Sequence, residues 1–571
     1  MPSPDFSTTE RSEFDFMSQS KKQSFLHGTA LLAAATAIVK IIGALYKIPL
    51  KMIIGDEGFS YFNTAYEIYS LLLLISTAGL PGAMSRMISQ ASALGHSNQV
   101  RKVYTPSRNL FLILGIAGTL LMTLCSKWLA SFQGQPDAWY AIACLGPCVL
   151  LICMMSTYRG FFQGQGNMIP TSVSQVLEAI VKLIVGIGLA MGVMQLTDSI
   201  PKAAGGAILG VTVSCVASVL YLLSCFRKGY RQLPESSDEA LSQKSTAKQL
   251  LAIAIPITIG AAGLQLLTVL ETGIYMDNIL GLLQDGRYDN SVINALRQQV
   301  LTNYPGISLE NLQNKVAANL KGIYNMAQTV YNLPVAFVAP ITISIIPAIT
   351  SHLTLQNNRG ARATAESAAR ITGLICMPCA VGLIVLSAPV MALLGGYGGE
   401  QLKLASQLMS IMGVCIIFNS VVLLTNAIMQ AHGHANLPVV NMFIGGILKL
   451  IAVFVLTANP HIAILGTPIG SFLCYVSITA LNLLTMRKCI SHPPAIMKNL
   501  GRSALAAIIM GVVVYGVYYV LPTQSRVLLC AVPVMAGVAV YAFAAIKFKA
   551  ITHEDCLLLP KGEKLAKLLK L

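Results

Sequence analysis

The chain is built mainly from long apolar segments, and this feature constrains its fold more than any other. Crossing the hydrocarbon core of a bilayer takes about 20 apolar residues in a helix. The segments that reach this length lie near 28–50, 62–87, 109–130, 138–163, 169–194, 203–226, 249–280, 323–353, 365–390, 402–431, 437–457, 461–486, 501–521 and 525–547. Only 11% of the residues are charged, against about 25% in soluble domains. The sequence therefore predicts an all-α polytopic membrane protein with 14 transmembrane helices.

The distribution of basic residues predicts how these helices are oriented. Lysine and arginine accumulate in the cytoplasmic loops of membrane proteins. If the N-terminus is cytoplasmic and the helices alternate, most of the 39 lysines and arginines fall on the cytoplasmic side, and both termini lie there. The formal net charge of +16 then reflects topology and attraction to anionic membrane lipids, so nucleic acid is not an expected partner.

An internal repeat divides the chain into two halves. Between Tyr158 and Gly186 one apolar segment ends, the chain turns through Gln163–Asn167, and the next segment starts at Pro170; the same pattern recurs around Gly433. Each half holds six predicted helices, so both halves enter the membrane from the same side, a known transporter arrangement. We expect two six-helix lobes in a parallel pseudo-two-fold repeat, followed by two C-terminal helices.

The repeat and two polar connections predict the divisions of the chain. These are a cytoplasmic N-terminal tail at 1–27, an N-lobe at 28–226, a cytoplasmic linker at 227–248, a C-lobe at 249–486, a helical hairpin at 487–547 and a basic cytoplasmic tail at 548–571. The C-lobe includes an external loop at 281–322, where helical spacing predicts short helices at 292–300 and 309–320. The first apolar segment is too long for a signal-peptide core, so we expect it to remain as a helix.

Three stretches of the sequence resemble the MATE-like (MOP) flippase superfamily. They are YEIYSLLLLISTAGLPGAMSRMISQ at 66–90, RGFFQGQGNMIPTSVSQVLEAIVKLIVG at 159–186 and YNMAQTVYNLPVAFVAPITISIIPAI at 324–349. More narrowly they resemble its SpoVB-type polysaccharide-biosynthesis branch, which is related to the MurJ lipid II flippases. The resemblance implies two lobes around a central cavity that opens alternately to each side of a bacterial plasma membrane. It also implies an undecaprenyl-linked saccharide as cargo, moved from the inner to the outer leaflet.

A flippase for such a cargo needs a cationic cavity, because a phosphate and sugar headgroup cannot lose its hydration without replacement. Lys40, Lys47 and Lys51 form a stripe along the first helix, and they are our candidates for binding the diphosphate. Snorkelling to the membrane interface is the alternative for Lys47 and Lys51. The resemblance places Lys40 where MurJ-type proteins carry an arginine. This chain lacks their helix-2 arginines and has Leu71–Leu74 there, which weighs against lipid II as the cargo.

Acidic residues in the apolar segments are the second group of candidates. Glu67 and Glu271 could balance the lysines, bind a sugar hydroxyl or take up a coupling cation, H⁺ or Na⁺; a structural ion pair is the alternative. Glu178 and Lys182 stand four residues apart in one helix, which predicts a self-neutralising structural pair. For Lys449 the sequence shows no such partner, and Arg159 is expected to anchor a loop or meet lipid phosphate.

Polar and proline residues complete the candidate set. Asn325, Gln328 and Asn332 share one helix face, and with Asn63 they are expected to face the cavity and bind substrate. Internal prolines can kink helices and act as hinges; the candidates are Pro256, Pro334, Pro340 and Pro347. His432 and His434 flank Gly433 with no acid or cysteine nearby, so a plain turn is favoured over a metal site.

The sequence favours a non-enzymatic flippase that moves a polyprenyl-(di)phosphate saccharide for envelope synthesis, that is, for peptidoglycan, capsule or spore cortex. It contains no phosphate-cradling loop, so an ion gradient, the membrane potential or downhill flux would supply the energy, and no cofactor besides a coupling cation is expected. Envelope-synthesis enzymes are conceivable partners. The alternatives are a MATE-type cation-coupled antiporter, a non-transporting scaffold for envelope or spore assembly, and a membrane enzyme acting on polyprenyl lipids.

Overall fold

The computed structural model describes residues 8–77, 79–231, 242–522, 525–548 and 550. For some residues inside helices, including most of those before residue 45, it describes the backbone and not the side chain. In the described ranges the protein is helical and contains no strand. The helices of the first half are α1 (Thr8–Thr77), α2 (Leu80–Ala93), α3 (Ser97–Leu124), α4 (Ser126–Phe132), α5 (Trp139–Gly164), α6 (Ile169–Thr197) and α7 (Ile200–Arg231). Those of the second half are α8 (Gln243–Gln284), α9 (Ser291–Asn303), α10 (Leu309–Thr354), α11 (Asn358–Val385), α12 (Ser387–Leu394), α13 (Gly399–Ala431), α14 (Asn436–Thr457) and α15 (Gly466–Cys489). The C-terminal helices are α16 (Ile496–Val520) and α17 (Arg526–Lys547), and short 3₁₀ turns lie at Pro136–Ala138 and Ala463–Leu465.

Helix α1 combines two of the predicted apolar segments. It is kinked at Gly55, whose φ of 68° lies in the left-handed region that only glycine adopts at little cost. The segment predicted at 62–87 is in turn divided, because α1 ends at Thr77 and α2 starts at Leu80 with Pro81 in its first turn. Proline is favoured there since the first helical N–H groups have no partner within the helix.

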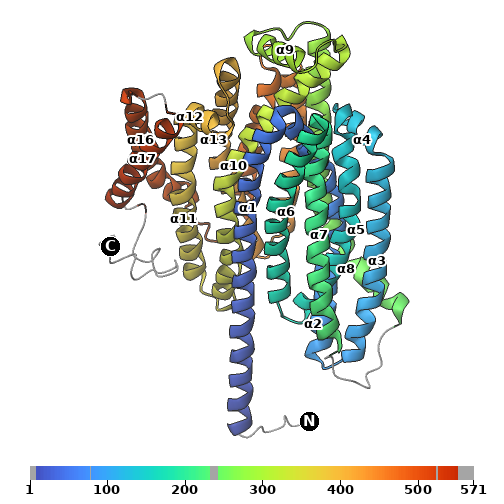
Figure 1. Cartoon of the computed structure of the whole chain (residues 1–571). Helices are drawn as coiled ribbons and strands as arrows, with labels where there is room; N and C mark the ends of the chain where they lie inside the picture. The colour runs from blue at the N-terminus through green and yellow to red at the C-terminus, as the bar shows by residue number, and fades with distance from the viewer. Residues whose placement is uncertain (1–7, 78, 232–241, 523–524, 549, 551–571) are drawn as a thin grey trace.

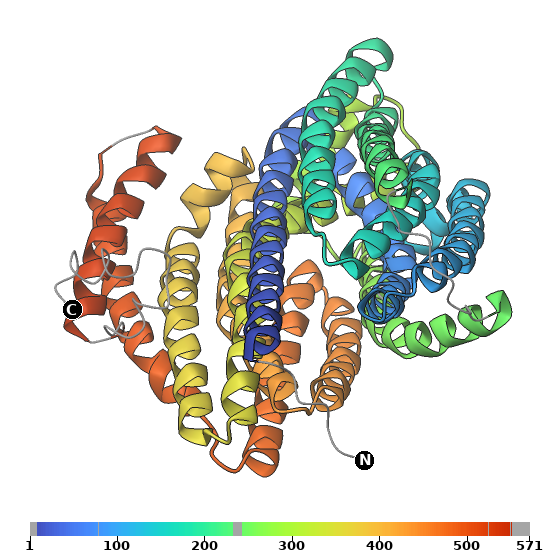
Figure 2. The same cartoon turned by 90° about the horizontal axis from the view of Figure 1, so that it is seen from below.

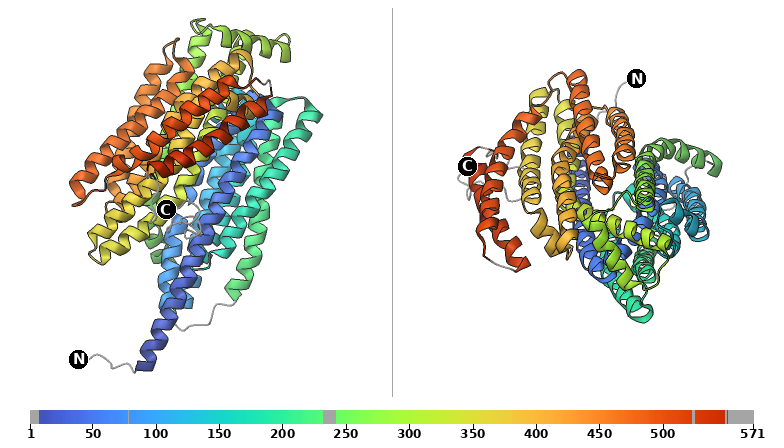
Figure 3. Two further views of the ribbon diagram at one scale, coloured as in Figure 1. Left: turned by 90° about the vertical axis from the view of Figure 1, so that its left-hand side faces the viewer. Right: turned by 90° about the horizontal axis from the view of Figure 1, so that it is seen from above.

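The connection predicted at 281–322 differs in part from expectation. Helix α9 confirms the first of the two short helices. The second, expected at 309–320, is wrong as a separate element, because it is the start of the 46-residue α10. Ser308 caps this helix by accepting a hydrogen bond from the Asn311 N–H, and no breaker follows before the apolar part begins. Helix α9 lies at the end of the molecule opposite the start of α1, and we call this the α9 end (Figures 1 and 3).

The helices pack in corresponding pairs in the two halves. In the first half α6 packs along α7, α3 along α5 and α5 along α7; in the second half α14 packs along α15, α11 along α13 and α13 along α15. The last two helices, α16 and α17, pack against each other and α16 packs along α11. Seen from below, they form one edge of the bundle, and α3 and the start of α8 lie at the other, with α1 between the two edges (Figure 2).

The protein is a multi-pass membrane protein by the length and composition of its helices. Within the described residues, 12 stretches are long and apolar enough to cross a membrane. The difference from the 14 predicted arises at two places. The predicted segments at 28–50 and 62–87 contribute to one stretch, Leu45–Ser92, and the segment at 323–353 in α10 is not among the 12.

Candidate charged centre between the two halves

Six charged side chains from five helices form a linked group in the interior, which we call the central cluster. Its members are Lys47, Glu67, Lys182, Glu271, Lys321 and Lys449. Four lysines and two glutamates give it a formal charge of +2. Charges inside a membrane protein are costly and mark functional sites by default. The cluster is therefore the candidate functional site.

Lys47 and Lys182 are the two cluster lysines that have no carboxylate partner among the described residues. Lys47 Nζ donates a hydrogen bond to Asn63 Oδ1 at 3.0 Å, while Lys182 Nζ lies 5.8 Å from the centre of the Tyr46 ring. Lys182 is close enough to Lys47 to repel it electrostatically, and Glu67 is close enough to attract it. Neither lysine forms an ion pair with any residue that the structure describes. Lys47 and Lys182 together therefore form a local excess of positive charge.

Glu67 is paired with a lysine that the sequence did not single out. Lys321 Nζ lies 3.3 Å from Glu67 Oε2 and donates a hydrogen bond of 2.7 Å to Thr64 Oγ1. The Lys321 side chain is fully buried, with an exposed fraction of 0%. It comes from α10 and its partners from α1, so the pair joins the two halves of the chain. Sequence reasoning missed Lys321 because it assigned the residue to an external loop. A usable signal was present, since Lys321 stands four residues before Asn325 on the same helix face.

Glu271 and Lys449 form the second ion pair of the cluster. Lys449 Nζ lies 2.6 Å from Glu271 Oε2 and joins α14 to α8. The sequence-based view that Lys449 lacks a partner was a statement about neighbours in one helix, and packing supplies the partner from another. The other carboxylate oxygen, Oε1, is buried and has no hydrogen-bond partner among the described residues.

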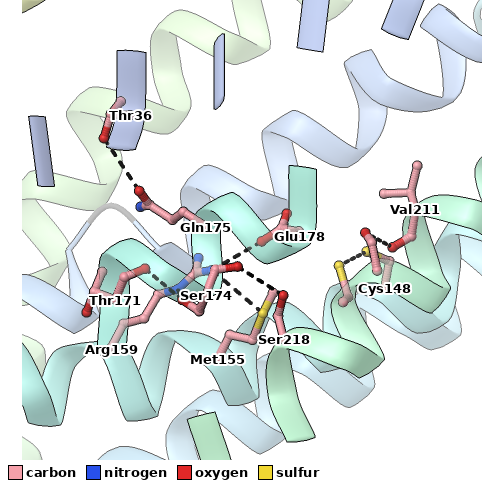
Figure 4. Close-up of polar contacts among 12 residues, drawn as sticks. Thr36, Cys148, Met155, Arg159, Thr171, Ser174, Gln175, Glu178, Val211 and Ser218 are labelled. Carbon is pink, nitrogen blue, oxygen red and sulfur yellow. Dashed lines mark hydrogen bonds and ion pairs between the residues drawn. The ribbon is translucent and has the colours of Figure 1, made fainter. Parts of the chain in front are cut away.

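The predicted pair of Glu178 with Lys182 is wrong. Glu178 Oε2 instead lies 3.1 Å from the Arg159 guanidinium, which also donates a 3.0 Å hydrogen bond to Ser174 Oγ (Figure 4). Arg159 is thus a link between α5 and α6 and not a loop anchor. A planar guanidinium on a neighbouring helix can reach two acceptors at once, and this geometry holds Glu178 away from a role beside Lys182.

The three residues of the expected polar stripe on α10 differ in how far they are buried. Asn325 is buried, with 2% of its surface exposed, and neither polar atom of its side chain has a partner within the described part of the chain. Gln328 is half-buried and Asn332 is exposed. Asn63 is buried and, besides accepting from Lys47, donates to the Phe59 carbonyl at 2.7 Å.

Lys51 contributes to a separate network at the α9 end. Only 7% of its surface is exposed, which argues against snorkelling. Its Nζ lies 3.4 Å from Asp56 Oδ1 and 3.9 Å from the centre of the Tyr397 ring, and it donates to the Gly395 carbonyl. The Tyr397 hydroxyl donates to Asp56 at 2.6 Å. Burial, and then the charge of Asp56, raises the pKa of Tyr397 well above its usual value, so this hydroxyl remains a donor.

A second group of contacts in the α9-end network centres on Lys315. Its Nζ lies 2.7 Å from Glu57 Oε1 and 3.2 Å from Asp137 Oδ2. Hydroxyls of Tyr61 and Tyr304 also donate to Glu57, at 3.2 and 3.1 Å. These contacts join α10 and the α9–α10 connection to α1 and to the turn before α5. Together with the contacts of Lys51, they hold the two halves together at this end.

Close backbone approaches accompany these contacts. A Cβ atom added to Gly322 would lie 2.0 Å from the carbonyl oxygen of Asp56, so α10 touches α1 directly at the α9 end. Towards the opposite end, a Cβ added to Gly79 would lie 2.1 Å from the Ala254 carbonyl oxygen of α8. Only glycine permits such contacts. The halves therefore touch on both sides of the central cluster.

Several predicted residues have side chains outside the described set. These are Lys40 in α1, Pro256 in α8, and Pro340 and Pro347 in α10. Pro334 is described, and it is buried within a continuous α10. No group of three or more histidine, cysteine, aspartate or glutamate side chains in the described ranges could hold a metal ion.

Comparison with known proteins relates this architecture to established families. The profile of the family described as polysaccharide biosynthesis protein matches residues 25–352, and the profile described as lipid II flippase MurJ matches residues 291–532. Stage V sporulation protein B of Bacillus subtilis (strain 168) is 24% identical over 547 residues, which cover 94% of this chain and 98% of that protein.

Solved structures show the same fold. A lipid II flippase MurJ in an inward closed conformation has a TM-score of 0.65 at 14% identity and covers 91% of this chain and 98% of its own. An inward-facing MATE multidrug transporter of the MOP superfamily has a TM-score of 0.60 at 14% identity and covers 81% of this chain and 99% of its own. The resemblance inferred from the three sequence stretches is thus confirmed. Because the first family profile covers more than half of the sequence, the chain belongs to the polysaccharide biosynthesis protein family.

Proposed function

We propose that the protein is a flippase that moves a polyprenyl-diphosphate saccharide from the inner to the outer leaflet of a bacterial plasma membrane. The observation that carries this proposal is the pair formed by Lys47 and Lys182. These two half-buried lysines repel each other and have no carboxylate partner among the described residues. Two like charges in a low-dielectric interior are unfavourable unless an anion joins them.

A diphosphate headgroup has the chemistry that this pair lacks. It brings at least two negative charges and several acceptor oxygens, and lysine binds phosphate as a point charge. The neighbouring amide of Asn63 and the polar atoms of Asn325, which have no described partner, supply donors and acceptors suited to sugar hydroxyls. The lipid tail would remain in the bilayer while the headgroup crosses through the protein.

Alternating access provides the movement in this proposal. Residues 28–226 and 249–486 act as two six-helix lobes, and the kinked α1 and the segment in α10 bring the number of spans to 14, with both termini in the cytoplasm. The α9-end network and the Gly322 contact close the outer side. Opening that side requires the pairs of Lys51 and Lys315 to separate, and opening the inner side requires the Gly79 contact to separate.

Glu67 and Glu271 are the candidates for energy coupling. Each forms an ion pair with a lysine of another helix, and the two carboxylates repel each other. Uptake of H⁺ or Na⁺ by either one would release its lysine for the headgroup. The protein works in this scheme as a transporter that makes or breaks no covalent bond.

A binding assay with purified protein in nanodiscs tests this function. We expect Lys47→Ala and Lys182→Ala each to weaken binding of a polyprenyl-diphosphate saccharide by at least about tenfold, the value of one charge-assisted hydrogen bond. Lys202→Ala, which removes an exposed lysine, is the matched control and should have no effect. Unchanged binding by both variants would refute the proposal.

The same assay separates the flippase from a MATE-type antiporter. An antiporter for cationic drugs needs excess negative charge, whereas the central cluster has a formal charge of +2. Tighter binding of a cationic drug than of the diphosphate lipid would favour the antiporter. In cells, depletion of the protein should cause a lipid-linked intermediate to accumulate in the inner leaflet.

A further inference from the structure

The two histidines around Gly433 lie in a cavity that the proposed transport cycle does not use. His432 and His434 belong to the turn between α13 and α14, and His492 belongs to the connection between α15 and α16. All three line one cavity of about 210 Å³ together with Arg362 of α11. Helix α10 starts beside α9 and ends next to this cavity, so the cavity lies at the end of the bundle opposite α9.

The polar side chains that line this cavity offer both hydrogen-bond donors and acceptors, with Arg362 as the one charged group among the described lining residues. The Arg362 guanidinium has five N–H groups; it forms an ion pair with Glu366 through Nε at 2.9 Å, which leaves the N–H groups of its two terminal nitrogens for a ligand. The His432 Nδ1 lies 2.8 Å from the Ile428 carbonyl oxygen; since a carbonyl only accepts, this nitrogen carries the proton. Nε2 of the neutral ring is then an acceptor, to which the P–O–H group of a protonated phosphate can donate. Asn358 and Ser491 add an amide and a hydroxyl, and no aspartate or glutamate is among the described residues that line the cavity.

Such a lining suits an anion better than a metal ion. Histidine and cysteine can bind metals, and Cys489 also lines the cavity, but no group of three such ligands in the described residues could hold one. Arginine repels cations and binds phosphate through several N–H groups.

The size and the position of the cavity identify the class of anion. Pockets for drug-sized molecules have volumes of about 300–1,000 Å³, so a cavity of about 210 Å³ is smaller than these and suits a small anion such as a phosphate group. By the distribution of lysine and arginine, this end faces the cytoplasm, where basic pockets between membrane helices bind anionic headgroups.

We infer that this cavity is a binding site for a phosphate group, presented either by an anionic lipid or by a soluble phosphate. It is separate from the central cluster and does not rest on the proposed transport function. A ligand there would bridge the α13–α14 turn to the connection that leads into α16 and α17. It would thereby tie the C-terminal hairpin to the second half of the chain.

Cys489 is a built-in reporter for the site. Its thiol is exposed and lines the cavity, whereas the exposed Cys125 follows α3 at the α9 end. We would react the full-length protein in nanodiscs with a thiol reagent and quantify both positions by peptide mass spectrometry. Three conditions are compared: phosphatidylcholine alone, phosphatidylcholine with phosphatidylglycerol, and phosphatidylcholine with inorganic phosphate. We expect the ligand to slow the reaction of Cys489 at least fivefold and to leave Cys125 unchanged.

The three conditions also distinguish the sources of the phosphate group. Protection by phosphatidylglycerol alone identifies a lipid headgroup, and protection by inorganic phosphate identifies a soluble anion. Three single variants, Arg362→Gln, His434→Gln and His492→Gln, should each raise the ligand concentration needed to protect Cys489 by about tenfold. Arg487→Gln and Lys488→Gln remove exposed cations that do not line the cavity, and they are the matched controls.

Two results would overturn the inference. One is a Cys489 rate that neither lipid nor phosphate changes in the wild-type protein. The other is protection that the control variants reduce as much as the cavity variants do, which would show a general surface charge effect. Because the wild-type measurement needs no substitution, a variant that fails to fold leaves the test intact.

Discussion

The buried pair of Lys321 and Glu67 gives the sharpest test of how the two halves are held together. At 3.3 Å and an effective dielectric constant of about 20, the attraction between the two charges is about 5 kcal/mol. Lys321→Met would leave Glu67 without this partner, and Glu67→Gln would leave a fully buried ammonium with neutral acceptors only and no opposite charge. Breaking a buried pair from one side costs about 3–5 kcal/mol. Removing both partners together costs much less than the sum of the two single losses in the free energy of unfolding, since no uncompensated charge remains.

A double-mutant cycle measures this coupling. The free energy of unfolding of purified protein in mild detergent is determined by denaturant titration for the wild type, both single variants and the double variant. We expect each single change to lower it by about 3–5 kcal/mol, with a coupling energy of about 2–3 kcal/mol. Lys403→Met, at an exposed surface pair, should cost less than about 1 kcal/mol. Additive single costs for Lys321 and Glu67 would refute the pairing.

Three further predictions follow from contacts between helices. Gly322→Ala should push α10 away from α1 and open the α9 end, which raises the rate at which a thiol reagent modifies cysteine there. Gly516→Ala is the control, because an added Cβ would meet nothing within 4 Å. Equal modification rates in the two variants would contradict the close approach of α10 to α1. Arg159→Met should lower the free energy of unfolding by about 3 kcal/mol, and Lys182→Met should not. A larger loss for Lys182→Met than for Arg159→Met would instead support the pair of Glu178 with Lys182. Glu271→Gln should lower the free energy of unfolding by about 3–5 kcal/mol, and the additional change Lys449→Met should recover part of that loss. If the double variant recovers nothing, the ion pair is refuted.

The sequence located about half of the candidate site. Glu67, Glu271, Lys47 and Asn63 stood out because polar groups inside apolar segments are rare and costly, and the structure brings all four to the central region. Lys315 and Lys321 did not stand out because they precede the apolar part of α10, where charge is ordinary. Only the length of α10 and its packing along α1 carry them into the interior.

Partner choice among charges depended on the tertiary structure. Glu178 has a lysine four residues later in its own helix, yet it pairs with Arg159 across the α5–α6 contact. Local spacing offers a partner only at the helix surface, whereas packing places a multi-donor guanidinium against the carboxylate in the interior. The same applies to Lys449, whose partner lies 178 positions earlier in the sequence.

The sequence by itself determined that this chain is a helical membrane protein, where most helices lie, and to which family its motifs belong. These properties depend on the apolar content and punctuation of short stretches, so each stretch carries its own evidence. The tertiary structure decided which charges are paired, which two lysines remain without a carboxylate partner in the described residues, and where the halves touch. Those properties depend on distances between helices far apart in the chain, and electrostatic attraction in a low-dielectric interior changes steeply with such distances.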